Sequence, residues 1–428
     1  MKNPKTFLQS LFEAAVKAAD PARNIASFLP EPPKGRLIIV GAGKGSAQIA
    51  AEFENAWEEA GHGTVEGLVV TRYGFGVECK NVEIIEASHP VPDAAGLVAS
   101  DRILQSVSNL SEDDLVVAVI SGGGSALLPA PPEGVSLEDE IALNEVLLAS
   151  GAPISAMNCV RKQVSRIKGG RLAIQAYPAK VLSLIVSDIP GDNPAHVASG
   201  PTVPDMGTLS EARDIVARYR LKLPQSIAAH LNRDFSDAPR PDDPKLSRNE
   251  YHIIASARVS LKAAAELSRK KGVPAVILSD SVEGETREIA RMHGAMAREI
   301  LAMDQPFEKP VLMLSGGETT VTLNGDGKGG PNSEFLLSLA LEIDGFDNIY
   351  ALSADTDGID GSQDNAGAFG DGTTITQMRE AGIDPAALLA NNDAWSAFDA
   401  IDELFVCGPT GTNVNDFRAI LITGNKHD

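Results

Sequence analysis

The sequence contains few of the residues that mark secreted or membrane-spanning proteins. Its 428 residues include three cysteines, Cys79, Cys159 and Cys407, which are far apart and form no CxxC pair. This scarcity predicts reduced thiols and excludes a disulfide framework and a cysteine zinc site. No apolar run approaches the roughly 18 residues that a membrane span requires. The N-terminal stretch has helical apolar spacing without the apolar centre of a signal peptide, so we expect a docked amphipathic helix and a cytoplasmic protein.

Basic residues are also few, because 37 lysines and arginines stand against 58 aspartates and glutamates, giving a formal net charge of −21. Such a charge repels nucleic acids and anionic membranes, so we expect neither as a partner. A bound anion must therefore be held by local cations and backbone N–H groups. Aromatic residues make up only 5% of the chain, so Ala, Val, Leu and Ile must fill its cores. The length favours two domains.

Short apolar runs are plentiful, each ending in Gly, Ser or Asp, and stretches of helical character separate most of them. Examples are residues 36–43, 115–124, 181–188, 310–317 and 349–355. This alternation predicts an α/β fold with parallel sheets that helices cover on both faces. Ligands of such sheets bind at the carboxyl ends of the strands, where these Gly, Ser and Asp residues lie. Residues 234–250, with three prolines and many charges, are the expected linker or exposed excursion between two halves.

The glycine-rich stretch IIVGAGKGS follows a strand and precedes a helix, but it lacks the dinucleotide fingerprint. Ser46 stands where GxGxxG requires its third glycine, and no acidic residue closes the next strand, EGLVVT. The phosphate-loop pattern GxxxxGK[ST] is absent as well. Gly43 and Lys44 at the mouth of the helix would still suit an anion. The alternative is a tight turn with a solvated lysine.

A second glycine-rich stretch, SGGGSALL, follows another strand. Ser121 and Ser125 supply hydroxyls, and N–H groups in this run can point at one ligand; its glycines are Gly122, Gly123 and Gly124. No GxSxG pattern is present, which argues against a serine hydrolase. The alternative is a turn that crosses close to a neighbouring strand.

Basic residues concentrate in NCVRKQVSRIKGGRLA, residues 158–173. On a single helix, Arg161, Ser165 and Lys168 would share one face, beside an apolar stripe of Val160, Val164 and Ile167. Lys168, followed by two glycines, suits a substrate carboxylate or phosphate. The alternative is a solvated basic face.

Two oxygen-rich loops follow strands later in the chain. The first contains Asp188, Asp192 and Asn193, and the second contains Asp355, Asp357, Asp360, Asp364 and Asn365. Such loops suit Mg²⁺ bound together with substrate phosphates. The spacing and closing glutamate of a calcium-binding EF-hand are missing. Because Asp and Gly are common in turns, ordinary turns are the alternative.

The stretch LSGGETTVTLNGDGKGGPNSEF, residues 314–335, carries Glu318, Lys328 and Asn332. We expect these three side chains to face a cleft shared with the first domain. His89 and His196 are further acid/base candidates, but the sequence identifies no partner for either. The alternative for both histidines is a structural, hydrogen-bonded role.

Together these stretches resemble the glycerate 2-kinase family, formerly often labelled hydroxypyruvate reductase. The signatures occur in order across most of the chain: GAGKGS, ASHPVPD, SGGGSALL, NCVRKQVSRIKGGRLA, SDIPGDNP, LSGGETTVT, GGPNSEF and SADTDGIDG. The resemblance implies a Rossmann-like N-terminal domain (1–240), a smaller MOFRL-type α/β domain (241–428) and an active site in the cleft between them. It also implies ATP- and Mg²⁺-dependent phosphorylation of D-glycerate at O2, giving 2-phosphoglycerate and ADP.

The same resemblance implies roles for individual residues. Lys44 would stabilise the transferring phosphoryl group, and a second family cation, an Arg in a GGRN segment, is replaced here by Pro331. Either Lys328 or Arg161 compensates, or that Arg is dispensable.

Phosphoryl transfer further requires a metal site and a proton acceptor. Asp188 or the 355–360 loop, through Asp355 and Asp357, would hold Mg²⁺. Asp188 or Asp192 would accept the proton, and the basic helix would hold the glycerate carboxylate. A homodimer is one candidate assembly.

Two other functions compete with this interpretation. A nicotinamide-dependent hydroxypyruvate reductase would need a dinucleotide fingerprint and an acidic ribose-binding residue, which the sequence lacks. A non-catalytic sugar-phosphate binding protein that has kept the fold is the second competitor.

Overall fold

The computed structural model describes residues 3–233 and 237–424, which form two compact units. The N-terminal unit is Pro21–Ile254, and the C-terminal unit combines the segment up to Asp20 with the chain from Ala255 onward. The expected division at residue 240 therefore differs from the observed one in two ways. The chain passes from the N-terminal to the C-terminal unit between Ile254 and Ala255, later than residue 240. The first helix, which precedes Asp20, belongs to the C-terminal unit together with the end of the chain.

The sheet of the N-terminal unit has the strand order of a dinucleotide-binding fold. Within the described residues it comprises β1 (Leu37–Ala42), β2 (Glu66–Arg72), β3 (Val82–Ala87), β4 (Leu115–Ile120), β5 (Lys180–Val186) and β6 (Glu250–Ala255). The order is β3-β2-β1-β4-β5-β6. The neighbouring pairs β3–β2, β2–β1, β1–β4 and β4–β5 are all parallel. The chain reverses its direction of progress across the sheet between β1 and β4, so the switch point that binds ligands lies there.

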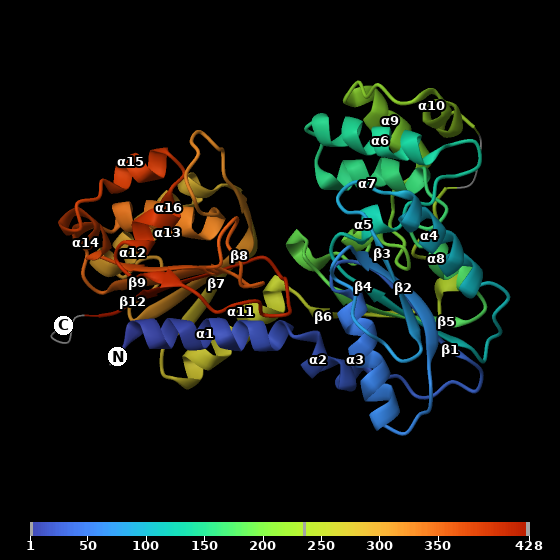
Figure 1. The fold of residues 1–428 in the computed structure, drawn as a ribbon, viewed down its shortest axis with the longest axis horizontal. Helices are drawn as coiled ribbons and strands as arrows, with labels where there is room; N and C mark the ends of the chain where they lie inside the picture. Colours follow the sequence, from blue (N-terminus) through green and yellow to red (C-terminus); the bar gives the residue numbers. More distant parts are fainter. Residues whose placement is uncertain (1–2, 234–236, 425–428) are drawn as a thin grey trace. The chain divides into compact units, whose positions relative to one another are not determined.

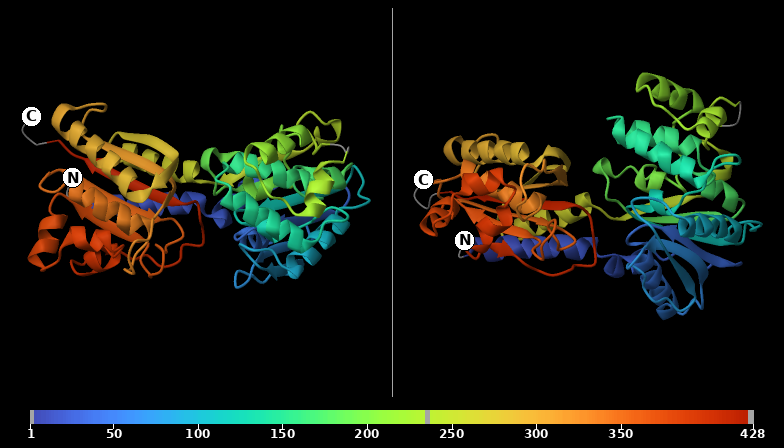
Figure 2. Two further views of the ribbon diagram at one scale, coloured as in Figure 1. Left: turned by 90° about the horizontal axis from the view of Figure 1, so that it is seen from above. Right: turned by 45° about the horizontal axis from the view of Figure 1, so that its top comes forward.

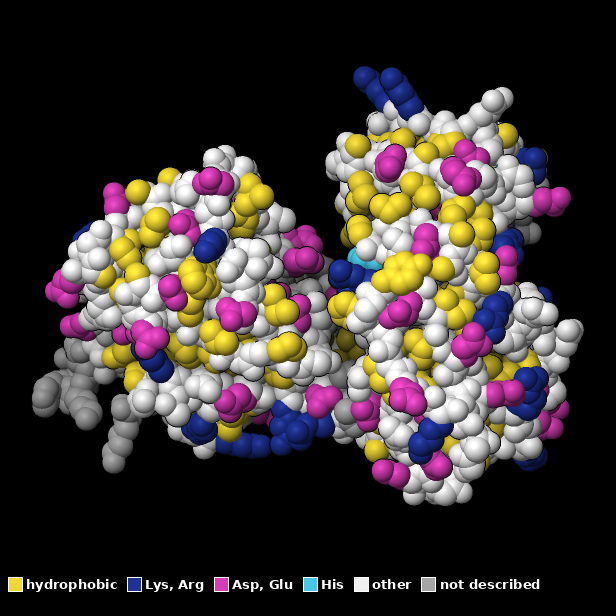
Figure 3. All heavy atoms as spheres, in the orientation of Figure 1, with side chains coloured by type: hydrophobic (Ala, Val, Ile, Leu, Met, Phe, Trp, Pro, Cys, Tyr) yellow, Lys and Arg dark blue, Asp and Glu magenta, His cyan; other side chains and the backbone are white. Residues whose placement is uncertain are grey.

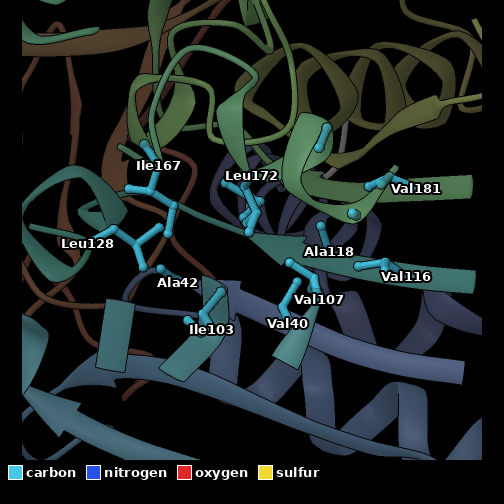
Figure 4. Close-up of a cluster of buried hydrophobic side chains, with 14 of the residues drawn as sticks. Val40, Ala42, Ile103, Val107, Val116, Ala118, Leu128, Ile167, Leu172 and Val181 are labelled. Carbon is cyan, nitrogen blue, oxygen red and sulfur yellow. The ribbon is translucent and has the colours of Figure 1, made fainter. Parts of the chain in front are cut away.

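Helices pack against this sheet as the alternation of patterns predicts, and those within residues 137–163 and 209–231 pack on one another in a separate cluster (Figure 1). They are α2 (Pro21–Asn24), η1 (Ile25–Phe28), α3 (Ser46–Glu59), α4 (Ala94–Ser106), α5 (Gly124–Leu127), α6 (Leu137–Ala149), α7 (Ile154–Gln163), α8 (Arg171–Ala176), η2 (Pro190–Asp192), η3 (Val197–Ser199), α9 (Leu209–Arg218), α10 (Gln225–Leu231) and η4 (Pro244–Leu246). Alternate strand residues such as Val40 and Ala118 pack against Ile103 of α4 and Leu172 of α8 (Figure 4). Because close packing restricts these side chains to single rotamers, they fix the positions of the strand ends relative to one another.

The sheet of the C-terminal unit is mixed rather than parallel. The described part contains β7 (Ala275–Glu285), β8 (Val311–Thr320), β9 (Ile349–Asp355), β10 (Gly367–Asp371), β11 (Leu404–Phe405) and β12 (Asp416–Ile422). Their order is β11-β10-β9-β12-β8-β7, with β7 and β8 parallel and the other pairs antiparallel. The expectation of parallel sheets throughout is wrong here, because buried antiparallel strands carry the same continuous apolar runs.

Helices lie on both faces of this second sheet, as Figures 1 and 2 show. They are α1 (Pro4–Ala19), α11 (Ala257–Lys270), α12 (Thr286–Met303), α13 (Pro331–Glu342), α14 (Thr374–Glu380), α15 (Pro385–Ala390) and α16 (Ala394–Asp399). Residues of α1 and α11 pack with Leu312, Phe417 and Leu421, whereas residues of α12 and α13 pack with Met313 and Ile420. Among the described helices, none is both long enough and apolar enough to cross a bilayer.

The expected linker at 234–250 is part of the N-terminal unit. Residues 234–236 lie outside the described residues. The rest contains η4, whose Leu246 is buried in the main core, and leads into β6 beside β5. The prolines and charges of this segment mark a surface connection within one unit.

The basic stretch 158–173 is not one helix, so that prediction is wrong. Helix α7 ends at Gln163, and α8 begins at Arg171. Gly169 and Gly170 between them adopt positive φ angles of 66° and 82°, which an α-helix cannot contain. The predicted stripe is consequently divided, with Val160 in the cluster of α6, α7 and α9 and Ile167 in the main core.

Substitution of Phe12 in α1 tests whether the first helix is a structural part of the C-terminal unit. The buried ring contacts Phe405 and Phe417 edge to face, with centroids 5.0 and 5.8 Å away. Phe12→Ala should lower the free energy of unfolding by about 3–5 kcal/mol, since it leaves a cavity. Chemical denaturation measures this, with the exposed Gln9→Ala on the same helix as the control. A loss under about 1 kcal/mol for Phe12→Ala would contradict the packing.

Candidate active site

Two loops meet at the switch point of the N-terminal sheet. One joins β1 to α3 through residues 43–45, and the other joins β4 to α5 through residues 121–123. The N–H of Lys44 donates to the carbonyl of Gly122 over 2.8 Å, and the N–H of Gly45 donates to Ser121 Oγ over 2.9 Å. These bonds hold the two loops together; with Asp188, they form what we call the switch-point cluster.

Glycine is required where these loops approach each other and Asp188. Gly43 has a φ of 144°, and a Cβ there would lie 2.1 Å from Ser121 Oγ. A Cβ on Gly122 would lie 1.9 Å from Asp188 Oδ2. One on Gly123, whose φ is 80°, would lie 3.0 Å from His89 Nε2. The glycines therefore bring Lys44, His89 and Asp188 around one short loop.

Asp188 and Lys44 are the charged groups of this cluster. Burial raises the pKa of Asp188, although the nearby charge of Lys44 acts against this rise. Among the described residues, the half-buried Lys44 ammonium has no hydrogen-bond or ion-pair partner. A carboxylate with a raised pKa accepts protons well, and an unpaired ammonium attracts anions.

The other candidates near the end of β5 lie on the following turns. Asp192 is half-buried with a φ of 53°, and Asn193 is exposed. Asn193 Oδ1 accepts the N–H of Ala195 over 3.1 Å. Asn193 and His196 also line a hollow of about 410 Å³. Burial and then the charge of Lys162 lower the pKa of His196, so its imidazole is mainly neutral.

His89 faces the switch-point cluster from the loop after β3. Burial is the first cause that lowers its pKa, followed by the charges of Lys44 and Arg72. A neutral imidazole beside Gly123 can donate or accept one hydrogen bond. The expected acid/base role stays a prediction.

A chain of hydrogen bonds joins the glycine-rich loop to α7. Ser125 Oγ lies 2.9 Å from Ser199 Oγ, and Ser199 Oγ donates to Asn158 Oδ1 over 3.1 Å. Arg161 Nη1 donates to the same Asn158 oxygen over 3.3 Å, and its Nε donates to Asn144 Oδ1 over 2.7 Å. Burial lowers the pKa of Arg161, yet no carboxylate of the described chain forms an ion pair with it. A half-buried guanidinium held by neutral amides suits a small carboxylate or phosphate.

Lys168 and Lys162, in contrast, are already paired. The buried Lys168 ammonium donates to Glu140 Oε1 and to the carbonyl of Leu128, both over 2.9 Å. Lys162 forms an ion pair with Asp205. Burying either lysine without its carboxylate would be costly. These contacts favour a structural role for Lys168 rather than the predicted contact with substrate.

In the C-terminal unit, carboxylates gather where β9 ends and β12 begins. Asp355 and Asp416 are register partners on these strands, and Asp355 Oδ1 accepts the N–H of Asp357 over 2.9 Å. Burial, followed by the charges of Asp357 and Asp416, raises the pKa of Asp355 to about 9. Among the described residues, no three His, Cys, Asp or Glu side chains are placed to hold a metal ion by themselves. Predicted ligands Asp188 and Asp355 lie in different units.

Asn332 and Asp360 hold the start of α13. The carboxylate of Asp360 accepts the N–H groups of Asn332 and Ser333, each over 2.8 Å. Asn332 Nδ2 donates to Asp416 Oδ1, and its Oδ1 accepts from Ser353, each over 2.7 Å. Because Asn332 is buried and satisfied on both sides, its contacts favour a structural role over the predicted ligand contact.

Glu318 and Lys328 lie on the surface of the C-terminal unit. The Lys328 ammonium is 5.2 Å from the centroid of the Trp395 ring, and its backbone N–H donates to Asp393 over 3.0 Å. Lys328 is therefore an exposed cation on an anchored loop.

No sequence motif indicated Asp416 and Arg418, which the structure places in the buried polar layer under α13. Arg418 forms an ion pair with Asp416 and donates to Thr319 Oγ1 over 2.9 Å. The only sequence signal was their i, i+2 spacing in an apolar strand, which places both on one face. Their partners come from β8 and α13, so only the fold identifies the layer.

Two family models match parts of this chain, and several known proteins match nearly all of it. A model described as "Domain of unknown function (DUF4147)" matches residues 7–232, and the MOFRL family model matches residues 311–416. The D-glycerate 2-kinase of Thermotoga maritima is 38% identical over 413 residues, covering 96% of this chain and 97% of that protein. A protein of Agrobacterium vitis with the provisional name hydroxypyruvate reductase is 48% identical, covering 97% of this chain and 94% of its own length. A crystal structure of glycerate kinase from Thermotoga maritima matches with a TM-score of 0.88 at 36% identity, covering 98% of this chain and 99% of that one.

Buried His293 predicts how the stability of the C-terminal unit depends on pH. Its Nδ1 lies 2.8 Å from the carbonyl of Ile289 and must donate, so Nε2 accepts from Ser315 over 3.0 Å. Burial lowers the pKa of His293 to about 4, below the usual 6.5 or so of an unfolded chain. Between these values the unfolded state binds more protons, so this contribution to stability is lost as pH falls from about 6.5 towards 4.

His293→Gln should therefore change the pH profile. The difference in unfolding free energy between wild type and variant should shift by up to about 3 kcal/mol between pH 7 and 4. Denaturant titrations at several pH values measure this shift, with the exposed His62→Gln as the matched control. Parallel profiles for wild type and His293→Gln would contradict the assignment.

Proposed function

This chain belongs to the glycerate 2-kinase family, and we propose that it transfers the γ-phosphoryl group of ATP to O2 of D-glycerate, giving 2-phosphoglycerate and ADP. The observation that carries the proposal is the placement of Lys44 beside Asp188 at the switch point. Phosphoryl transfer requires mainly positioning and charge stabilisation. One cation and one proton-accepting carboxylate at a glycine-rich loop supply both.

We assign separate tasks to the residues of the switch-point cluster. Lys44 binds the transferring phosphoryl group, because its ammonium is unpaired within the described chain. N–H groups from Gly122 to Ser125 cradle phosphate oxygens. Asp188 accepts the proton of the C2 hydroxyl as the new P–O bond forms. Asp192, on the next turn, remains the alternative proton acceptor.

The glycerate carboxylate is assigned to Arg161. The guanidinium is half-buried and joined to Ser125 through Asn158 and Ser199. The charge of Glu140 acts on it, but no described carboxylate forms an ion pair with it. Its fixed fork of donors matches a carboxylate. Lys168 cannot replace it without leaving Glu140 as an unpaired buried charge.

The residues at the end of β9 fit a divalent cation. Asp355 and Asp357 are close enough for one charge to raise the pKa of the other, a repulsion that a cation would relieve. Mg²⁺ typically takes one or two carboxylates and completes its shell with phosphate oxygens and water. We propose that Asp355 and Asp357 hold Mg²⁺, which would neutralise charge on the nucleotide phosphates.

The replacement of the family arginine by Pro331 is compatible with this assignment. Pro331 begins α13, a position where proline favours a helix. Lys328, on the preceding loop, is exposed and contacts the Trp395 ring, but it forms no ion pair within the described chain. We propose that Lys328 supplies the second cation.

A cytoplasmic location and a homodimer remain predictions.

Asp188→Asn tests the proton acceptor. The variant should lose at least about two orders of magnitude in kcat, because an amide cannot take the proton. Coupled ADP release with D-glycerate measures this, followed by identification of 2- against 3-phosphoglycerate. Asp242→Asn, at an exposed carboxylate, is the control. A rate within threefold of wild type would remove Asp188 from the mechanism.

The reductase named for the Agrobacterium vitis relative is tested in parallel. Steady oxidation of NADH or NADPH by hydroxypyruvate in the presence of wild type would contradict the kinase proposal. ADP release dependent on D-glycerate excludes the non-catalytic sugar-phosphate binding protein.

Arg161→Ala tests the carboxylate site. The KM for D-glycerate should rise by at least about tenfold, the effect of losing one charge-assisted hydrogen-bonded pair. The KM for ATP should stay within about twofold of wild type. Arg218→Ala, at an exposed arginine of the same unit, is the control. Equal changes in both KM values would indicate a general disturbance of the site.

A further inference from the structure

Two exposed aromatic side chains follow β2, next to the switch-point cluster. Tyr73 is 53% exposed and Phe75 is 46% exposed. Among the described residues, eight aromatic rings are buried in the cores, and Tyr73 and Phe75 are two of the five that are exposed. Exposed apolar groups gathered beside a functional site mark a binding surface more often than scattered ones do.

The position of these rings relates them directly to the loop that carries Lys44. Strand β2 pairs in parallel with β1, and Thr71 Oγ1 donates to the carbonyl of Lys44 over 3.2 Å. The N–H of Gly43 donates to the carbonyl of Val70 over 3.2 Å. The turn that begins at Arg72 therefore starts immediately beside the proposed phosphate-binding loop.

The turn that presents the rings is held in a fixed shape. The N–H groups of Gly74 and Gly76 both donate to Glu86 Oε1, over 2.8 and 2.9 Å. The N–H of Phe75 donates to the carbonyl of Arg72 over 3.0 Å. Such preorganisation lowers the entropic cost of binding a ligand.

Arg72 lies over this turn with its charge unpaired. The centre of its guanidinium is 5.2 Å from the centroid of the Phe75 ring. It forms no ion pair with any described carboxylate. Burial and the charge of Lys44 lower the pKa of His89, and the charge of Arg72 is a further, smaller cause. A guanidinium above an aromatic ring, beside an anion-binding loop, combines a surface for a planar group with a charge for phosphate.

We propose that Arg72, Tyr73 and Phe75 form the platform for the adenine ring and inner phosphate of the nucleotide. Of the two substrates, only ATP contains a planar aromatic group, whereas glycerate is a small aliphatic acid. Bases stack on aromatic side chains through their π faces. In sheets with this strand order, nucleotides lie across the carboxyl ends beside the switch point. The inference rests on the proposed function, because it takes Lys44 as the phosphate contact.

The test compares ligands with and without a base. ADP and inorganic tripolyphosphate are titrated calorimetrically into wild type, Phe75→Ala and Arg72→Ala in the presence of Mg²⁺. Phe75→Ala should lower the affinity for ADP by about tenfold or more. Its affinity for tripolyphosphate should stay within twofold of wild type. Arg72→Ala should weaken ADP by at least as much, and Phe75→Tyr should bind ADP as wild type does.

The matched control is Tyr177→Ala in the same unit. Tyr177 is 49% exposed and has the Lys245 ammonium 5.8 Å from its ring centroid, so it reproduces an exposed aromatic–cation pair away from the switch-point cluster. This variant should bind ADP as wild type does.

The outcomes separate the platform from the proposed function. The platform would be overturned if Phe75→Ala bound ADP as tightly as wild type, or if it lost as much affinity for tripolyphosphate as for ADP. It would also be overturned if wild type did not bind ADP. ADP binding that depends on Phe75, without phosphorylation of D-glycerate by wild type, would support the platform and overturn the proposed function alone.

Discussion

The close approach of two loops at the ends of β1 and β4 is the constraint on which the candidate site depends. Gly43 lies against Ser121 with no room for a side chain, and the N–H of Lys44 is fixed on the carbonyl of Gly122. This approach also brings the carboxylate of Asp188 against Gly122. A single glycine-rich run therefore sets the positions of a cation, a carboxylate and the His89 imidazole. Rigid placement of this kind is what phosphoryl transfer needs most.

The distribution of charge explains how an acidic protein can bind anions. Its formal net charge is −21, so anion binding depends on where individual cations stay unpaired. Lys162 and Lys168 are buried and matched by carboxylates. Lys44, Arg72 and Arg161 have no such partners within the described chain. Figure 3 shows acidic side chains spread over the visible face of each unit, against which a few local cations set the binding positions.

The C-terminal unit uses its polar residues differently. Asp360, Asn332 and Asp416 form a buried layer that fixes the first turn of α13, and Arg418 balances part of its charge. Buried polar groups are stable only when they are paired in this way. At the edge of the layer, burial and then the negative charges of Asp357 and Asp416 raise the pKa of Asp355. The layer thus supports a carboxylate that a cation would stabilise.

The sequence by itself determined the class of fold, the positions of most strands and the stretches that form the loops at their ends. Apolar runs and glycine spacing are local, and they reflect burial and backbone freedom directly. Only the tertiary structure decided that the second sheet is mixed, that α1 belongs to the C-terminal unit and that residues 158–173 form two helices. It also separated the unpaired Arg161 from the paired Lys168 and revealed Asp416 and Arg418. Each of these facts depends on partners distant in sequence, because the charge and hydrogen bonding of a side chain are set by the groups that the fold brings to it.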